Sequence, residues 1–218
     1  MKIRKLIDLS IPINNNTPIY PGDPKPNIHS AASIEKDGYN VSHVIMGSHT
    51  GTHVDAPYHF NKDGLKMDEL PLNLFLAEGV VIDVTGKDEC EEITREDLLP
   101  YTEKLVAGRT VLFHTGWSKF AGDEKYYKHP YIGKDVIHFL LCRGIRVFLI
   151  DALNIDPPDG SSFEGHSLIT GMNGVIGENY TNFDLIDFDN PFIITLPLYF
   201  RGLDGSPVRA VAVDFDSE

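Results

Sequence analysis

Apolar residues along this chain recur mainly in short runs, and short runs of this kind predict β-strands more readily than helices. Residues 3–11 (IRKLIDLSI) alternate between apolar and polar side chains, as a strand with one covered face does. Residues 79–86 and 145–151 are short, nearly continuous apolar runs beside glycines, a pattern typical of buried strands. We also predict strands within residues 42–54, 109–117, 191–200 and 206–215.

One segment has a clear helical pattern. In residues 133–144 (GKDVIHFLLCRG) four apolar side chains form a stripe at helical spacing, and Gly144 is a natural C-terminal stop. Residues 94–105 begin like a helix whose length Pro100 limits, and a short helix is expected at residues 166–172. The pattern therefore predicts a mixed α/β, strand-rich fold with a substantial sheet.

Composition narrows the class of protein. The chain has 218 residues, of which 42% are hydrophobic and 23% charged, so it can bury a core, and we expect residues 1–218 to form a single domain. The formal net charge of −13 argues against nucleic acid or an anionic membrane as a partner. It does not argue against a metal cation, which acidic surfaces attract.

Two features bear on the cellular compartment. Cys90 and Cys142 lie far apart in the sequence, and we expect both to be reduced thiols. The opening segment MKIRKLIDLSIPI is followed by no apolar run of signal length, and no segment has the apolar length of a membrane span. We therefore predict a cytoplasmic protein without membrane contact.

The densest chemistry lies in residues 47–60 (GSHTGTHVDAPYHF), which contain three histidines and an aspartate: His49, His53, Asp55 and His59. β-Branched residues and Gly51 favour an extended backbone here over a helix. On a strand, His49, His53 and Asp55 would share one face, and Gly51 would leave room for an ion. Two imidazoles and a carboxylate are typical ligands of a catalytic divalent metal.

His59 follows Pro57, and a turn there would bring its imidazole over the metal without making it a ligand. A histidine beside a metal-bound water can take or give a proton at neutral pH. Spacing alone leaves open that the cluster is structural or incidental, since a single histidine on a strand usually has no functional role.

The segment HTGTHVDAPYH, residues 49–59, fits the HxGTHxDxPxH motif and resembles the cyclase-like metal-dependent hydrolases. That family includes bacterial kynurenine formamidase and isatin hydrolase. The resemblance continues through IDLSIPINNNTPIYPGDP, VLFHTGW and GHSLITGMNGVIGENYTNFDLI, at residues 7–24, 111–117 and 165–186.

The resemblance implies a swivelling β/β/α fold assembled as a homodimer or larger homo-oligomer. It also implies one or two divalent metal ions, for which zinc is the best match and manganese the alternative. By the same resemblance His49, His53 and Asp55 bind the first ion, and Asp55 bridges to a second ion completed by His166 and Glu178. His59 matches the catalytic histidine of the family.

The reaction implied is metal-dependent hydrolysis of an amide-type C–N bond in a small molecule. We take arylformamidase activity on N-formylkynurenine, a step of tryptophan breakdown, as the main hypothesis. A cyclic amide or lactone hydrolase, such as an isatin hydrolase, is the first alternative, and a non-catalytic metal- or ligand-binding member of the fold is the second. Tyr20 stands where formamidase-like members often carry a tryptophan, and it is our candidate for stacking on an aryl substrate.

Overall fold

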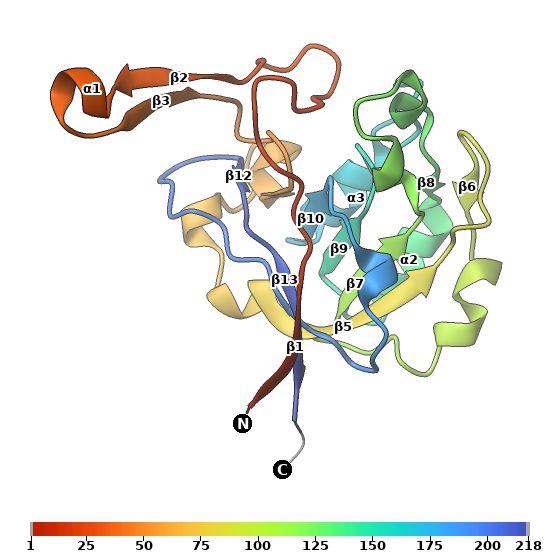
Figure 1. Ribbon diagram of the computed structural model, residues 1–218. Helices are drawn as coiled ribbons and strands as arrows, with labels where there is room; N and C mark the ends of the chain where they lie inside the picture. Colours follow the sequence, from red (N-terminus) through yellow and green to blue (C-terminus); the bar gives the residue numbers. More distant parts are fainter. Residues whose placement is uncertain (1, 217–218) are drawn as a thin grey trace.

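The computed structural model describes residues 2–216 and is built around a mixed nine-stranded sheet (Figure 1). The strand order is β1-β13-β11-β5-β7-β9-β10-β4-β12. These strands are β1 (Ile3–Asp8), β4 (His53–Asp55), β5 (Leu76–Asp83), β7 (Thr110–His114), β9 (Val147–Ile150), β10 (Val175–Glu178), β11 (Phe192–Ile194), β12 (Gly205–Pro207) and β13 (Val211–Phe215). The predicted mixed α/β, strand-rich fold is confirmed.

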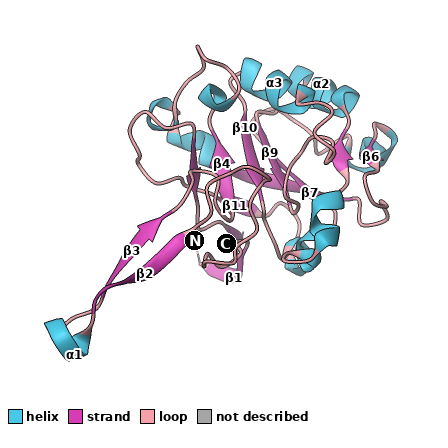
Figure 2. Cartoon of the chain, turned by 90° about the horizontal axis from the view of Figure 1, so that it is seen from above, coloured by secondary structure: helices cyan, strands magenta, loops and turns pink. Residues whose placement is uncertain are grey.

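The centre of the sheet is parallel and both of its flanks are antiparallel. β5, β7, β9 and β10 run in parallel, β4 pairs antiparallel with β10 and β12, and β1, β13 and β11 form the other antiparallel flank. Helices α2 (Lys134–Cys142) and α3 (Glu164–Gly171) lie side by side over one face of the sheet (Figure 2). Crossovers that place helices on a sheet are the usual way to join parallel strands.

Both faces of the central strands are buried, which explains their nearly continuous apolar sequences. Phe113 and Phe148 belong to the core cluster that includes the apolar stripe of α2, whereas their neighbours Leu112 and Leu149 belong to a second cluster. Adjacent residues of one strand point to opposite faces, so the two clusters lie on the two sides of the sheet. Trp117 is buried in the first cluster.

The predicted helix in residues 133–144 is confirmed as α2, and Gly144 adopts a left-handed φ of 82° just past its end. The expected short helix at 166–172 corresponds to α3, which begins two residues earlier and ends at Gly171. Residues 94–105 form only a 3₁₀ helix, Glu96–Tyr101, which contains Pro100. The described chain also has a two-stranded sheet of β6 (Glu92–Ile93) with β8 (Tyr131–Ile132), and further 3₁₀ helices at Pro57–His59, Met67–Glu69, Leu72–Phe75, Trp117–Phe120, Glu124–Lys128 and Phe183–Leu185.

A strand was predicted within residues 42–54, but the sequence did not reveal that the first part of this segment belongs to a hairpin arm that extends from the body of the molecule (Figures 1 and 2). The arm consists of β2 (Asn27–Ala32), the single-turn helix α1 (Ile34–Asp37) and β3 (Val41–Ile45). β2 pairs only with β3, and every residue of β3 is exposed.

The prediction that His49, Gly51 and His53 lie along one strand is wrong. β4 begins at His53, and the preceding residues form a turn in which Gly51 has a φ of 70°. The space beside Gly51 is taken by Ile13, whose Cγ1 lies 2.7 Å from where a Cβ would be. Gly51 is therefore needed for the turn and for packing, not to make room for an ion.

Two further expectations concern the rest of the described chain. Cys90 and Cys142 are both free thiols, as expected. Among the described helices, none combines the length and apolar character needed to cross a membrane.

Candidate metal centre and active-site pocket

The centre of the site lies where β4 meets β10. His53 and Asp55 stand two residues apart on β4, so their side chains share a face, and Glu178 of β10 is directly opposite His53 in the register. The Nδ1 atom of His53 donates to the carbonyl oxygen of Gly51 at 2.8 Å, which leaves Nε2 facing the two carboxylates. Glu178 accepts a hydrogen bond from the Ile155 amide at 3.0 Å, and this bond fixes its orientation.

His166 reaches the same point from α3. Its Nδ1 lies 2.6 Å from Oδ2 of Asp156, and the Asp156 carboxylate also accepts the amides of Gly165 and His166. A carboxylate only accepts, so Nδ1 carries the proton and Nε2 points toward Asp55 and Glu178. A carboxylate behind an imidazole is the usual arrangement that orients a metal-binding histidine.

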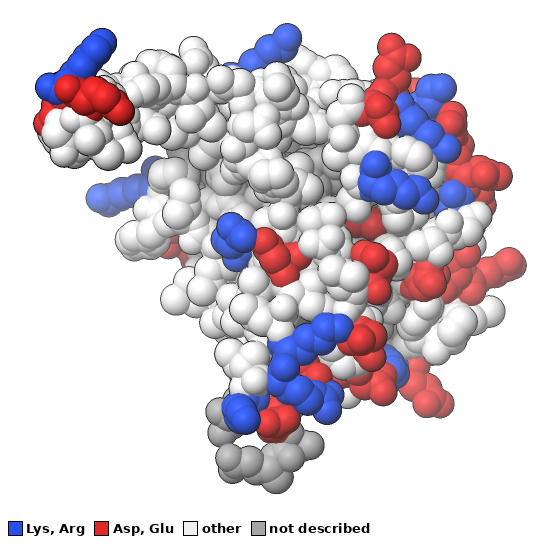
Figure 3. Space-filling view, viewed as in Figure 1, with Lys and Arg blue, Asp and Glu red and all other residues white. Residues whose placement is uncertain are grey.

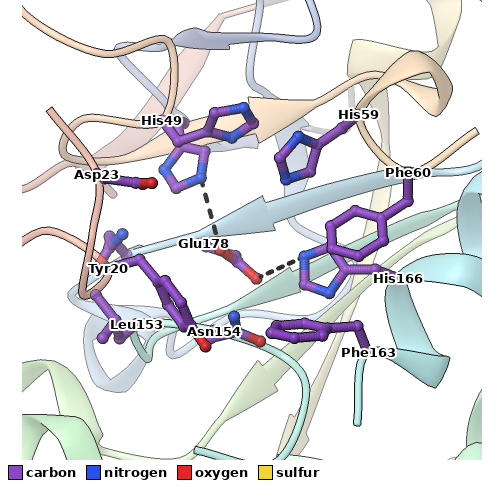
Figure 4. Close-up of a pocket in the computed structure, with 12 residues that line it drawn as sticks. Tyr20, Asp23, His49, His59, Phe60, Leu153, Asn154, Phe163, His166 and Glu178 are labelled. Carbon is purple, nitrogen blue, oxygen red and sulfur yellow. Dashed lines mark ion pairs between the residues drawn. The ribbon is translucent and has the colours of Figure 1, made fainter. Parts of the chain in front are cut away.

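Four contacts between potential metal ligands link these side chains into a closed set, and Figure 4 marks the two that involve Glu178. The Nε2 atom of His53 is 3.4 Å from Oδ1 of Asp55 and 3.6 Å from Oε2 of Glu178. The Nε2 atom of His166 is 3.6 Å from Oδ2 of Asp55 and 3.5 Å from Oε1 of Glu178. Metal bonds of about 2.0 to 2.2 Å in a tetrahedral site separate neighbouring ligand atoms by about 3.4 Å, close to all four distances.

Asp55 supplies an independent test of whether a cation fits. Its Oδ2 atom is buried and accepts no hydrogen bond from any residue in 2–216. An unpaired carboxylate oxygen in a protein interior is costly unless a charge neutralises it. The donor set and this oxygen together fit a divalent metal ion, with each of the two carboxylates presenting one oxygen to His53 and the other to His166.

His49 contacts the centre from the turn before β4. Its Nδ1 lies 2.7 Å from Oδ1 of Asp55, and its Nε2 lies 3.0 Å from Oδ2 of Asp204. Gly205, the first residue of β12, provides the space for this ring, since a Cβ there would lie 2.7 Å from Cε1 of His49. The structure thus brings all five sequence-predicted ligands to one place: His49, His53, Asp55, His166 and Glu178.

The pKa shifts describe a strongly negative potential at this point. Burial lowers the pKa of His49, but the charge of Asp55 and hydrogen bonds to Asp204 and Asp55 outweigh it and raise the pKa to about 11. Burial also lowers the pKa of His166, but the hydrogen bond with Asp156 and the nearby negative charges outweigh it and raise the pKa to about 10. A site that stabilises extra positive charge on two imidazoles is also favourable for a divalent cation.

His59 lies at the edge of the centre, on the 3₁₀ helix Pro57–His59. Its Nδ1 is 3.4 Å from Oδ2 of Asp204, and its ring centroid is 4.1 Å from that of His49 and 5.9 Å from that of His166. One donor atom each from His49, Asp55 and His59 also fall within 4.8 Å of one another. Position alone therefore allows His59 to be a proton-transfer group or a ligand.

A pocket of about 210 Å³ opens above these groups, and its walls include three aromatic side chains beside Asp23, Leu153, Asn154 and Asn179 (Figure 4). Phe60 lies 4.6 Å from His166 and 5.6 Å from Phe163 between ring centroids, and Tyr20 contacts Phe163 edge-on at 6.3 Å. Burial and the charge of Glu178 raise the pKa of Tyr20, so its hydroxyl stays neutral. Tyr20, Phe60 and Phe163 surround the space next to the metal-type ligands.

Sequence reasoning missed Asp156 and Asp204, the two carboxylates behind the imidazoles. Asp156 is ten residues from His166, and Asp204 is 155 residues from His49, so no local spacing links them. The wall residues Phe60 and Phe163 were also missed, since isolated aromatic residues carry no signal that separates pocket from core.

The fold and this ligand set define a candidate metal-dependent enzyme. Residues 7–157 match the family described as putative cyclase. The chain is 34% identical over 212 residues to the kynurenine formamidases of Bacillus cereus and Bacillus mycoides, covering 97% of this chain and 98% of each relative. The chain belongs to the cyclase family, which confirms the resemblance seen in its motif.

Solved structures agree with this assignment. An isatin hydrolase bound to the product analogue thioisatinate superposes with a TM-score of 0.88 at 26% identity, covering 96% of this chain and 92% of that one. A predicted metal-dependent hydrolase from Bacillus stearothermophilus has a TM-score of 0.78 at 26% identity, with 97% and 98% coverage. These relatives identify the chain as a hydrolase.

Proposed function

We propose that this protein is a metal-dependent arylformamidase that hydrolyses N-formylkynurenine or a closely related aryl formamide. The observation that carries the proposal is the closed set of His53, Asp55, His166 and Glu178, in which a buried oxygen of Asp55 accepts no hydrogen bond from residues 2–216. This set lies next to a pocket that three aromatic side chains help to line. Its full-length relatives in two Bacillus species are kynurenine formamidases, which favours a formamide as substrate.

The metal would be held by His49, His53, Asp55, His166 and Glu178. Imidazole and carboxylate ligands at these separations suit zinc best, with manganese as the alternative. A divalent ion, when bound, supplies Lewis-acid chemistry and makes water a stronger nucleophile at neutral pH.

The side chains of this protein then position the reactants and move protons. Water oxygen bonds to the formyl carbon, the C–N bond breaks, and the nitrogen takes up a proton to give an arylamine and formate. His59 stands at the pocket edge, where an imidazole can pass a proton to the departing nitrogen. This placement favours a catalytic protein over a purely structural metal site, which needs no proton shuttle.

The aromatic walls support an aryl substrate. A cavity of about 150 Å³ is large enough for benzene, so a pocket of about 210 Å³ admits a substituted ring. Tyr20 and Phe163 would contact the ring edge-on or stacked, while the formyl group reaches the metal-type ligands. Tyr20 thus remains our candidate substrate-binding residue.

The direct test is hydrolysis by purified protein, after chelation and after restoring zinc or manganese. We expect metal-restored turnover of N-formylkynurenine, with the chelated protein inactive. Isatin, run in parallel, tests the cyclic amide alternative, which the structural match to an isatin hydrolase favours. Turnover of isatin without turnover of the formamide would move the substrate to that class. If metal binds and neither compound reacts, the proposed activity is wrong.

We also propose that the protein is a homodimer in which the arm of β2 and β3 packs against a second copy. A lone two-stranded hairpin is only marginally stable in water, and this one exposes large apolar side chains, including Tyr39 at 59%, Val44 at 49% and Ile45 at 50%. Charged side chains gather at the arm tip and on the body, whereas the shaft of the arm is uncharged (Figure 3). Apolar surface free of charge is typical of a surface that another protein covers.

Light scattering after size exclusion measures this assembly. We expect about twice the chain mass of 24.3 kDa for the unmodified protein and the mass of one chain for the Val44→Glu/Ile45→Glu double variant. Lys36→Gln, at the charged arm tip, serves as the control and should stay dimeric. A wild-type monomer, or a double variant that still dimerises, would contradict the arm-mediated dimer.

A single domain spanning residues 1–218 and a cytoplasmic location complete the proposal. The sheet that spans the chain from β1 to β13 supports the first. The second rests on the free thiols and stays a prediction.

A further inference from the structure

We propose that Asp204 is a positioning residue that orients His59 for proton transfer and supports His49 with the same carboxylate oxygen. The inference rests on the proposed hydrolase function of this site. Asp204 lies outside the motif that contains the two histidines, and reaches them from the loop that leads into β12.

Asp204 contacts three residues of segment 47–60: Ser48, His49 and His59. Its Oδ2 lies 3.0 Å from Nε2 of His49 and 3.4 Å from Nδ1 of His59, and its Oδ1 accepts a hydrogen bond from the Ser48 hydroxyl at 3.0 Å. A hydroxyl and two imidazole nitrogens thus face the Asp204 carboxyl group. An ionised carboxylate only accepts hydrogen bonds.

This requirement determines which proton arrangement on His59 the carboxylate favours. A hydrogen bond to Asp204 needs a proton on Nδ1, and neutral His59 then carries its lone pair on Nε2. Nε2 is the nitrogen left free to exchange protons with a substrate in the pocket. At 3.4 Å this contact is longer than the contact to His49 and is not a formed hydrogen bond, and such contacts of catalytic groups often tighten only when substrate binds.

The backbone holds Asp204 in a fixed place relative to His59. The Ala56 amide donates to the Asp204 carbonyl at 2.8 Å, and the His59 amide donates to the Ala56 carbonyl at 2.9 Å. The carbonyl of Leu203, the residue before Asp204, accepts a hydrogen bond from the Met67 amide at 2.9 Å. The carboxylate and the imidazole are thus tied to one short stretch of backbone, as positioning requires.

His49 gives Asp204 its second role. Nδ1 of His49 faces Asp55 and the other proposed metal ligands, while Nε2 faces Asp204. The Asp204 carboxylate therefore lies behind the proposed ligand His49, as the Asp156 carboxylate lies behind His166. Carboxylates in this position raise metal affinity about 10- to 100-fold. Loss of Asp204 should therefore weaken metal binding and, once metal is saturating, should still impair proton transfer.

The test compares two substrates that differ in their need for a proton. The nitrogen of an aryl formamide leaves only after protonation, whereas p-nitrophenolate leaves from p-nitrophenyl formate unaided. With saturating zinc, Asp204→Asn should lower kcat for the formamide about 100-fold or more with little change in KM, and for the ester less than about 10-fold. Asp68→Asn is the matched control, because Asp68 accepts the Gly202 amide in the same loop without touching either histidine, and it should be unchanged on both substrates.

Equal losses on the two substrates, or an Asp204→Asn protein that behaves like Asp68→Asn, would overturn the positioning role. Nitrogen-15 NMR of His59 in the zinc-loaded protein gives a readout that does not depend on activity. We expect the Nδ1–H form in the wild type and a shift toward Nε2–H in Asp204→Asn, and identical spectra would also overturn the role. If the wild type hydrolyses neither substrate, the proposed function fails, while the NMR comparison still decides the role of Asp204.

Discussion

Replacing His59 with alanine is expected to lower turnover of an aryl formamide by about 100- to 10,000-fold while the protein keeps its metal. This range is the usual contribution of a side chain that transfers a proton in the transition state. His59 stands at the pocket edge and belongs to neither pair of carboxylate–imidazole contacts that close the centre. Steady-state kinetics at saturating zinc, together with metal content by atomic emission, measures both parts of the prediction.

The second part matters because the donor atoms of His49, Asp55 and His59 also lie within 4.8 Å of one another. If His59 were a ligand, the His59→Ala protein would lose metal along with activity. If His59 had no role, the variant would retain full turnover. His138→Ala provides the control, since His138 is exposed on α2, and it should behave as the wild type.

The sheet was largely predictable because its signals are local. The apolar runs of β5, β7 and β9 reflect burial on both faces, and the stripe in residues 133–144 matches α2. The arm was not predictable by the same reasoning, because β2 and β3 pair with each other and bury neither face within the chain. β3 overlaps the strand predicted within residues 42–54, but no pattern in the sequence marks β2 or shows that the two strands pair.

In the candidate site, too, the residues that follow local rules were predictable and those that depend on distant contacts were not. His53 and Asp55 were correctly placed on one face because strand alternation is a local rule. The placement of His49 on that strand was wrong, yet a turn at Gly51 returns its ring to Asp55. Glu178 and His166 were found only through the family motif, since pairing between β4 and β10 brings together residues far apart in sequence.

The remaining members of the site depend on the folded chain. Asp156 and Asp204 act behind imidazoles, and their positions follow from the loop after β9 and the loop before β12. A carboxylate that supports another residue leaves no mark in a sequence motif. Such residues can be found only when side-chain contacts are known.

The largest expected effect on the metal itself comes from Asp55→Asn. Asp55 offers its two oxygens to His53 and His166, and an amide keeps the shape but replaces one oxygen with a donor that cannot bind a cation. We expect this variant to lose bound metal and measurable turnover. The change in Tm that zinc causes, measured by thermal unfolding of each protein with and without zinc, reports metal binding and does not depend on catalysis.

A metal that binds only the native state stabilises it by about 2.7 kcal/mol at a free concentration 100 times its Kd, which for a chain of this length raises Tm by about 5 to 10 °C. We expect that rise in the wild type and none in Asp55→Asn at any zinc concentration. Asp156→Asn should be intermediate: without the carboxylate behind His166, the rise should need about 10- to 100-fold more zinc. An equal rise in Tm for all three proteins would show that the cation binds elsewhere, because only the wild type retains both carboxylate oxygens of Asp55 and the carboxylate of Asp156.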